Sequence, residues 1–351
     1  MIIDPTNDPR WDEFVNHHPL GWICHLSGWG RVLEQSFKHI KGHYLAIPDE
    51  KGTGIRSALP LFEVRSWLTG DRLVSIPFAT LCDPLISSSE DFETLMDATL
   101  ELAGALNISR IQIRARAADE LIQDERLSSM RFYQHHYLSL EPDPEKLLKT
   151  FHRTCIRQKI TRAGKSNLTL RRAETKADLF EFYRVFFATQ KRLGLPPLPY
   201  GFFLALWDTF GQTGNVVVLL AEKEGQVIAG IILFIFRDRA SLEVAAWDEV
   251  YQSVCPNHFL YWEAIKHARE KGCSIFDFGR TSPNNHGLMK FKQYWGTQVV
   301  DLPEYRYPAQ TGEKTTNPDE SIRYRLIRAL CHRAPERAYE HLGRFCYRHL
   351  G

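Results

Sequence analysis

The 351-residue chain has no excess of one charge, no long hydrophobic run and no closely paired cysteines. Its 44 Lys and Arg balance 42 Asp and Glu, for a net charge of +2. Proteins that bind nucleic acid over their whole surface are usually far more basic, so contact with RNA or another polyanion would need a local patch. The longest hydrophobic run, Val227–Phe236, is about half as long as a membrane-spanning helix requires. The chain opens without a basic segment followed by a hydrophobic one, so we expect a cytoplasmic protein.

Motifs that would assign a common chemistry are also missing. The seven cysteines are scattered without a C-x-x-C pair, which is typical of reduced thiols packed in a core. Cys255 and His258 lie three apart, but no second ligand pair accompanies them, so no metal site is predicted. There is no G-x-S-x-G elbow, NTPase phosphate loop, H-E-x-x-H or G-x-G-x-x-G. The kinase-like triplet Asp277–Gly279 lacks the glycine-rich and His-Arg-Asp loops that a kinase requires upstream.

The order of expected elements repeats along the chain. The offset between corresponding positions, Gly54 with Gly225 and Ile111 with Ile275, is nearly constant, which indicates an internal duplication. Ordinary strand–helix alternation is the alternative explanation. The first half predicts strands at 43–47, 55–64, 72–76 and 110–114 and a helix at 92–106; the second predicts strands at 215–221, 226–237, 241–247 and 274–278 and a helix at 258–271. Helical segments precede each set, at 11–37, 143–165 and 176–193.

Prolines mark the expected boundaries. Glu141–Pro144 contains two prolines that interrupt any continuous element, and Pro308–Pro318 is rich in Thr, Gly and Pro. We therefore expect an N-terminal domain at 1–142, a C-terminal domain with the main site at 143–308, and a linker with a basic helical tail at 309–351. The tail combines arginines with a partial apolar stripe. This composition predicts either docking on an anionic membrane face or packing on the protein's own domain.

Polar, charged and aromatic residues gather between Trp247 and Trp295, at strand ends and loops where ligand sites on sheets usually lie. Asp277 stands between two phenylalanines on an expected strand, so it points to the opposite face, and Arg280 or Lys292 could pair with it. An internal ion pair that braces the turn at Gly279 is the alternative to a catalytic role. The other candidate ligand contacts are Trp247, Asn257, His258, Tyr261 and Trp295. For Asn257 and His258 the alternative is simple capping of the following helix.

A local basic segment offsets the balanced overall charge. Lys149–Lys176 holds nine Lys and Arg and a single acid, Glu174. Arg157, Arg162 and Lys165 are candidate contacts for the phosphates of a donor or of RNA. A solvated helix face is the alternative.

Several strings, taken together, resemble one family. They are Gly194–Pro199 with Phe202–Phe203, Pro256–Trp262, Phe276–Arg280, Phe291–Gly296 and the basic Arg157–Lys165. This combination resembles the Fem-type transferases, tandem-repeat members of the GNAT-like acyltransferase superfamily. The match covers roughly 147–307, whereas the first half is similar mainly in element order and in Leu59–Leu61 and Ser75–Phe78. The tail, with Ala334–Pro335 and Leu342–Gly343, resembles those of relatives associated with cell-surface polysaccharide pathways.

The resemblance implies an α+β fold of two tandem GNAT-like domains, each a mixed, mostly antiparallel sheet flanked by helices, plus the helical tail. It implies transfer of an acyl or aminoacyl group to an amine of a cell-envelope or exopolysaccharide precursor. Aminoacyl-tRNA or acyl-CoA would be the co-substrate, without a tightly bound cofactor. On this hypothesis Asp277 orients or deprotonates the amine, and Lys292 or Arg280 stabilises negative charge.

Two alternatives remain open. One is acetyl-CoA-dependent N-acetylation of a small amine or amino sugar. The Q/R-x-x-G-x-G/A turn that binds the pyrophosphate of acetyl-CoA is missing, and the nearest string, Arg269–Ser274, lies at a helix end instead. The other is a non-catalytic binding or assembly factor of the same pathway. The basic segment also implies contact with tRNA, and the tail implies peripheral contact with the inner membrane face.

Overall fold

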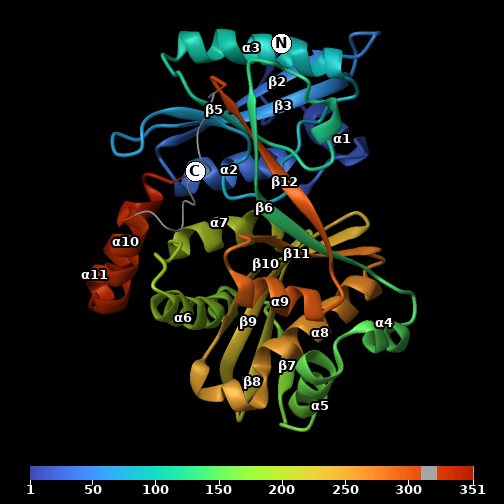
Figure 1. Ribbon diagram of the computed structural model, residues 1–351, viewed down its shortest axis with the longest axis vertical. Coiled ribbons are helices and arrows are strands. Elements are labelled where there is room, and N and C mark those ends of the chain that lie inside the picture. Colours follow the sequence, from blue (N-terminus) through green and yellow to red (C-terminus); the bar gives the residue numbers. More distant parts are fainter. Residues whose placement is uncertain (310–321, 351) are drawn as a thin grey trace. The chain divides into compact units, whose positions relative to one another are not determined.

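The computed structural model describes residues 1–309 and 322–350 (Figure 1). Contacts divide the chain into two compact units, which we describe separately. The first unit comprises Met1–Phe132 with residues 301–309 and 344–350, and the second comprises Tyr133–Val300 with Ile322–Gly343. The predicted linker falls mainly on residues 310–321, outside the described part of the chain.

The first unit is a mixed sheet in the order β1-β2-β3-β4-β5-β12. All its neighbours pair antiparallel except β4 and β5, which are parallel and are joined through helix α3. The elements are β1 (Ile2–Ile3), α1 (Arg10–His17), η1 (Ile23–His25), α2 (Ser27–Ser36), β2 (Ile40–Pro48), β3 (Ile55–Val64), β4 (Arg72–Val74), α3 (Ser89–Ala105), β5 (Ile111–Arg114) and η2 (Asp119–Leu121).

The second unit repeats this plan in the order β6-β11-β10-β9-β8-β7, with β10 and β11 as the parallel pair. Helix α8 joins that pair as α3 does in the first unit. The elements are α4 (Pro144–Thr150), η3 (Arg153–Arg157), α5 (Gln158–Gly164), β7 (Thr169–Arg172), α6 (Lys176–Leu193), α7 (Tyr200–Phe210), β8 (Val216–Lys223), β9 (Gln226–Phe236), β10 (Arg239–Trp247), η4 (Glu249–Val254), α8 (Pro256–Glu270), β11 (Ile275–Thr281), α9 (His286–Tyr294) and α10 (Ile322–Arg333). The predicted duplication is confirmed by this shared plan.

The two repeats exchange their last strands. Strand β6 (Ser128–Ser139) follows β5 in the chain but pairs with β11, whereas β12 (Gln298–Tyr307) follows β11 but pairs with β5. Helix α11 (Glu336–Tyr347) also contributes residues to both units. The contact boundaries therefore fall inside β6 and β12, and differ from the predicted 142/143 and 308/309. The prolines near residue 142 mark a real break between β6 and α4, but a local break does not reveal which sheet a strand joins.

Helix boundaries follow local signals where these are strong. Helix α6 begins at a capping box of Thr175 and Asp178 and ends at Gly194, whose φ of 70° suits the left-handed cap. Its bounds agree with the predicted 176–193. The predicted helical segment 11–37 is instead divided into α1, η1 and α2. A Cβ at Gly21 would lie 1.9 Å from the carbonyl oxygen of Val15, so the chain turns too tightly there for a continuous helix.

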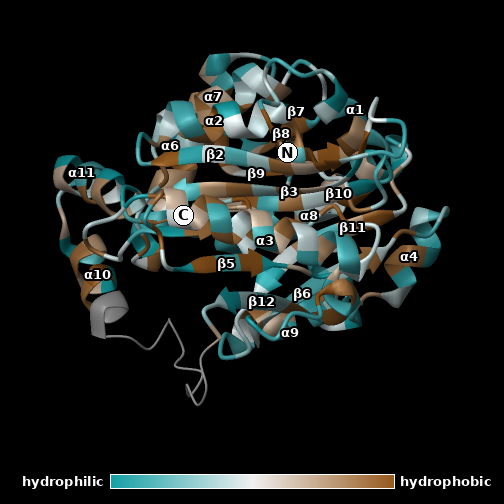
Figure 2. Ribbon diagram, turned by 90° about the horizontal axis from the view of Figure 1, so that it is seen from above, coloured by the Kyte–Doolittle hydropathy of each residue, from teal (hydrophilic) through white to brown (hydrophobic). Residues whose placement is uncertain are grey.

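The core of the second unit lies on both faces of its sheet. All residues of β9 after Gln226 are buried, because α6 and α8 both pack against β8, β9 and β10. A strand covered on both faces reads as a continuous hydrophobic run rather than an alternating one. Figure 2 shows such hydrophobic stretches in brown along strands of the sheets.

In the first unit the chain itself occupies the space beyond the parallel pair β4/β5. The Ser75 N–H donates to the Gln112 carbonyl, and the guanidinium of Arg114 donates to the carbonyl of Ala79 at 2.6 Å. One carboxylate oxygen of Asp83 accepts the backbone N–H groups of residues 116, 117 and 118 at 2.6, 2.6 and 3.0 Å. These backbone groups, at this end of the first sheet, form their hydrogen bonds with other residues of the first unit.

Asp83→Ala should lower the free energy of unfolding by on the order of 3 kcal/mol, because it leaves three backbone donors without their shared acceptor. Asp83→Asn keeps one acceptor oxygen and should lose less. Urea titration followed by circular dichroism measures both. Asp97→Ala, which removes a largely exposed carboxylate, is the control. If Asp83→Ala were as stable as that control, the proposed closure of the first unit would be wrong.

Candidate functional site

The parallel strands β10 and β11 separate soon after they pair. Arg239–Ser241 of β10 pair with Ile275–Asp277 of β11. The two strands then continue to Trp247 and Thr281 without pairing with each other. Each strand has an irregularity at this point: β10 between Leu242 and Val244 in its ladder with β9, and β11 between Asp277 and Gly279 in its ladder with β6. Such bulges redirect side chains and are common beside active sites. The candidate site is the region where these strands part.

Asp277 lies at the start of the separation and is fully buried. Its Oδ2 accepts a hydrogen bond from Nη1 of Arg239 at 2.8 Å, and its Oδ1 lies 2.9 Å from Nε2 of His135 on β6. Burial alone would raise the pKa of Asp277, but His135 and Arg239 together hold it below its usual value. The carboxylate is therefore ionised at neutral pH. Asp277 thus forms the internal ion pair that we considered as an alternative.

The partners predicted for that ion pair were wrong. The guanidinium of Arg280 lies over the ring of Tyr133, 4.8 Å from its centroid. Lys292, on α9, donates from Nζ to the carbonyls of Gly279 and Arg280 at 2.9 and 3.1 Å. Consecutive carbonyls of a regular strand point in opposite directions, so the φ of 70° at Gly279 is what lets one ammonium reach both. Arg239 was missed because the sequence placed it in a turn, where a charged residue looks like ordinary surface, whereas it is the first residue of β10.

Lys292 is nevertheless close to the charges of the site. Only 5% of the residue is exposed, and burial lowers the pKa of its ammonium to about 7, against the opposing effect of Glu243 and Asp277. Two of the three ammonium N–H groups are used by carbonyls. An ammonium has three N–H groups, and this one can change its charge near neutral pH.

Glu243 is the functional candidate that the sequence prediction missed. It sits at the irregularity of β10, and its carboxylate accepts a hydrogen bond from the Ser241 hydroxyl at 2.6 Å. Burial raises the pKa of Glu243 to about 7; the charge of Asp277 acts in the same direction, and Ser241 and Lys292 act against it. An acid inside an expected hydrophobic strand was the available signal. A carboxylate and an amine that both titrate near pH 7 are suited to proton transfer.

Three residues that were predicted to contact a ligand lie together on α8 and beside it: His258, Tyr261 and Trp295. The ring of His258 is stacked on Trp295, with centroids 6.1 Å apart, and Tyr261 is stacked on the same indole at 5.6 Å. Burial, assisted by the charge of Lys159, lowers the pKa of His258 to about 4, so its ring is neutral. Helix α8 begins at Pro256 with Cys255 as its N-cap, so the alternative of N-capping by Asn257 and His258 is wrong.

Trp247 and the basic segment take other positions in the second unit. Trp247 contacts α6, where the Arg192 guanidinium lies 4.5 Å from its ring centroid. Arg157 ends the π-helical turn η3 and is partly buried, whereas Arg162 and Lys165 are exposed on α5 and at its end. Helix α5 packs against α8, and the Lys159 charge acts on His258. The basic segment therefore lies beside the amino end of α8.

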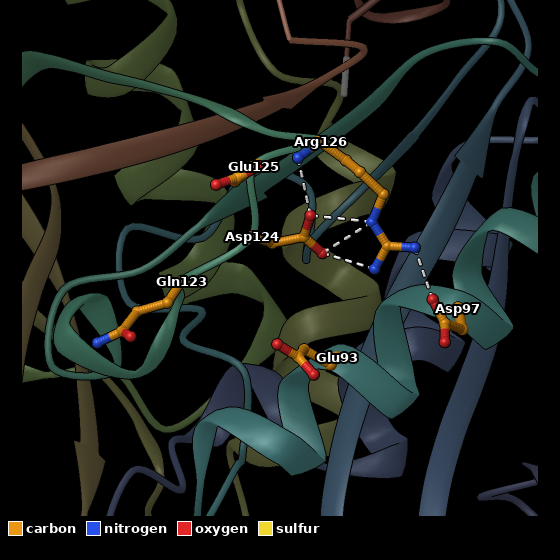
Figure 3. Close-up of a pocket in the computed structure, with 6 residues that line it drawn as sticks. All are labelled: Glu93, Asp97, Gln123, Asp124, Glu125 and Arg126. Atoms are coloured by element: carbon orange, nitrogen blue, oxygen red, sulfur yellow. Dashed lines mark hydrogen bonds and ion pairs between the residues drawn. The ribbon is translucent and has the colours of Figure 1, made fainter.

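A hollow in the first unit has a different character (Figure 3). Its lining residues are Glu93 and Asp97 of α3 with the segment Gln123–Arg126. Arg126 is held by Asp124 and Asp97 at 2.7 and 2.6 Å, so its charge is already neutralised. None of the predicted site residues lies there.

Residues 1–309 and 322–350 contain neither a metal-binding cluster nor a membrane-spanning helix. No three His, Cys, Asp or Glu side chains in these ranges are grouped so that they could hold a metal ion. No helix in them is long and apolar enough to cross a membrane.

One comparison with known proteins falls within the second unit. Residues 150–293 match the family model for the acetyltransferase (GNAT) domain. A 94-residue alignment is 31% identical to a lipid II:glycine glycyltransferase of Staphylococcus epidermidis and covers 25% of this chain and 23% of that protein. The protein of the same name from Staphylococcus aureus is 29% identical over 93 residues, 24% of this chain and 22% of its own length. The chain thus spans less than a quarter of these relatives.

The solved structures extend the similarity of fold to most of the chain. A crystal structure of FemX matches with a TM-score of 0.72 at 17% identity, over 86% of this chain and 95% of that one. The fold of this chain is therefore similar to that of FemX, and residues 150–293 are similar in sequence to a GNAT domain. A tandem GNAT protein from the clavulanic acid biosynthesis pathway matches with a TM-score of 0.54 at 11% identity, over 89% and 99% of the chains. The Fem-type resemblance and the predicted α+β fold of two GNAT-like repeats are confirmed.

Asp277→Ala should destabilise the protein by about 3–5 kcal/mol, because it leaves the buried His135 and the partly buried Arg239 without their carboxylate. Asp277→Asn should cost less, and its cost should depend on pH. The lowered pKa means that the ionised carboxylate stabilises the fold above the unfolded value of 3.8 and loses this effect as the pH falls through the folded value. Urea unfolding of both proteins between about pH 3 and 7 should show their difference shrinking towards pH 3. A difference independent of pH would contradict the ion pair.

Proposed function

We propose that this protein transfers an aminoacyl or acyl group from an activated ester or thioester to an amine of a cell-wall precursor. The observation that carries the proposal is the pair Glu243 and Lys292, both with a pKa of about 7, at the separation of β10 and β11. The similarity to lipid II:glycine glycyltransferases supports this class of reaction and acceptor. The donor and the transferred group are left open by this pair.

The separated strands and α8 provide a route for the donor. Beyond Ser241 and Asp277 the facing strand edges are unpaired, and they can hydrogen-bond an extended group with amides, as an added strand would. The amino end of α8 carries partial positive charge and favours an anion such as phosphate. In this proposal Arg157, Arg162 and Lys165 bind donor phosphates beside it. Aminoacyl-tRNA and acyl-CoA both present such phosphates.

The reaction then follows from the two titrating groups. The amine nitrogen attacks the donor carbonyl and forms a C–N bond, while the Glu243 carboxylate accepts the proton that the nitrogen loses. The free N–H of Lys292 donates to the oxyanion that develops. The C–O or C–S bond of the donor breaks, and the leaving oxygen or sulfur takes the proton from Glu243. Asp277 is a positioning residue here: it fixes Arg239 and His135, and its charge raises the pKa of Glu243.

The remaining predicted residues have binding roles in this proposal. His258 and Tyr261 are partly exposed and form a neutral aromatic wall that is backed by the fully buried Trp295. Asn257 and Trp247 stand at the adjoining ends of α8 and β10. Arg280 is exposed next to the bulge and can contact an anionic part of the acceptor.

Acetyl-CoA-dependent transfer to a small amine is a second candidate, favoured by the match to a GNAT acetyltransferase domain. The chain between β10 and α8 forms the short helix η4 and the left-handed residue Cys255 in place of a glycine-rich turn. This geometry supports a donor held mainly by side chains, and donor-binding measurements separate the two candidates.

Glu243→Gln should lower kcat by roughly 10²–10⁴, because a general base contributes about that factor. The wild-type rate should rise as Glu243 ionises and fall as Lys292 loses its proton, giving a bell centred near pH 7. The pH–rate profile of Glu243→Gln should lack the rise on the acidic side. The profile of Lys292→Met should lack the fall on the alkaline side. Transfer to an amine acceptor across pH measures these profiles. Glu270→Gln, on an exposed part of α8, is the matched control; wild-type rates and profiles in both site variants would exclude this mechanism.

Arg157→Ala, Arg162→Ala and Lys165→Ala should each weaken donor binding in a salt-dependent way. The slope of log K against log salt should fall by about one for each phosphate contact removed. Titration of aminoacyl-tRNA and of acyl-CoA at about 50 and 200 mM salt tests this and also identifies the donor. Lys51→Ala, in an exposed turn of the first unit, is the control. Losses that do not vary with salt would indicate damage to the fold of α5 instead.

A further inference from the structure

An exposed apolar patch stands in the first unit, away from the residues used above. Trp67 is 76% exposed and Leu68 is 44% exposed in the loop between β3 and β4. Phe345 of α11 and Leu350 are 47% and 42% exposed. Large apolar side chains at this exposure are ordinary when scattered, but a contiguous group of them marks an interaction surface.

His349 joins these residues into one surface. Its ring packs edge-on against Trp67 at 5.1 Å between centroids and against Phe345 at 5.0 Å. Its Nδ1 lies 2.9 Å from the Ser66 hydroxyl, and its carbonyl accepts a hydrogen bond from Thr69 at 3.0 Å. Burial lowers the pKa of His349, so the ring is neutral at pH 7. The patch is therefore held in place before any partner arrives.

Positive charge surrounds the patch. Arg344 and Arg348 are exposed on either side of Phe345, and the exposed Arg110 donates to the Thr69 carbonyl at 2.6 Å. The nearby acids are already paired: Arg65 binds both Asp71 and Glu63. Arg110 and Arg348 thus leave positive charge exposed beside the patch.

We propose that this patch docks the protein on an anionic lipid bilayer. Tryptophan, leucine and phenylalanine insert into the interfacial region of a bilayer, and arginines at their border attract anionic headgroups. A protein partner of ordinary composition would not need this ring of arginines. The sequence predicted membrane contact through the tail alone, whereas this surface combines the end of the tail with Ser66–Thr69. The inference does not depend on the proposed transfer reaction.

The test is co-sedimentation of the full chain with vesicles of phosphatidylcholine alone and of phosphatidylcholine with about 30% phosphatidylglycerol. We expect salt-sensitive binding to the anionic vesicles and at least tenfold weaker binding by the double variant Trp67→Ser/Leu68→Ser. Arg344→Gln and Arg348→Gln should each weaken binding by about fivefold, on anionic vesicles only. Phe180→Ser, which removes an exposed aromatic side chain from α6, is the control and should bind as wild type does.

Three outcomes would overturn the proposal: no binding of the wild type to anionic vesicles, equal binding to both vesicle types, or undiminished binding by the double variant. Light scattering adds a further distinction. If the wild type self-associates and the double variant does not, while neither binds vesicles, the patch contacts a second copy. The double variant should keep its melting temperature and its rate with a water-soluble acceptor, which separates this result from a failure of the proposed function.

Discussion

A single buried carboxylate joins three strands of the second unit. Asp277 on β11 binds Arg239 at the start of β10 and faces His135 on β6. An unpaired ion in this position would be very costly, so its partners must be in place whenever the sheet is formed. The strands are thereby fixed at the point from which β10 and β11 diverge. The site depends on this arrangement, because a separation between parallel strands is useful only if its starting point is rigid.

The same charge governs the chemistry of its neighbours. Glu243 and Lys292 are both removed from water, which disfavours the charged form of each and brings both pKa values to about 7. The ionised Asp277 raises the pKa of Glu243 and opposes the fall in that of Lys292. A base and a hydrogen-bond donor that share one electrostatic environment can thus exchange protons near neutral pH. In the proposed mechanism the fully buried Asp277 organises the site, and Glu243 is the group that accepts the substrate's proton.

The corresponding parallel pairs of the two repeats, β4/β5 and β10/β11, differ in what lies beyond them. In the first unit, the segment after β4 covers the region beyond β4/β5, and Asp83 satisfies three successive backbone N–H groups there. In the second unit, β10 continues past its parallel partner without such a cover. The two repeats share a topology and differ in what occupies this one region. The candidate site residues lie beside the unpaired edges in the second repeat.

Local patterns in the sequence determined the order of the repeated elements and the bounds of strongly marked ones such as β3 and α6. They also singled out Asp277, Lys292 and the aromatic residues of α8 as candidates for one site, since a polar residue in a hydrophobic strand or helix is visible without a structure. Hydrophobic periodicity is a property of residues close together in the sequence. The type and the bounds of these elements are set by such residues. The exchange of β6 and β12, the pairing of Asp277 with Arg239 and His135, and the position of Glu243 were decided only by the tertiary structure. Each depends on which strand, distant in the sequence, lies alongside and on how completely water is excluded from the contact. A short stretch of sequence determines neither of these.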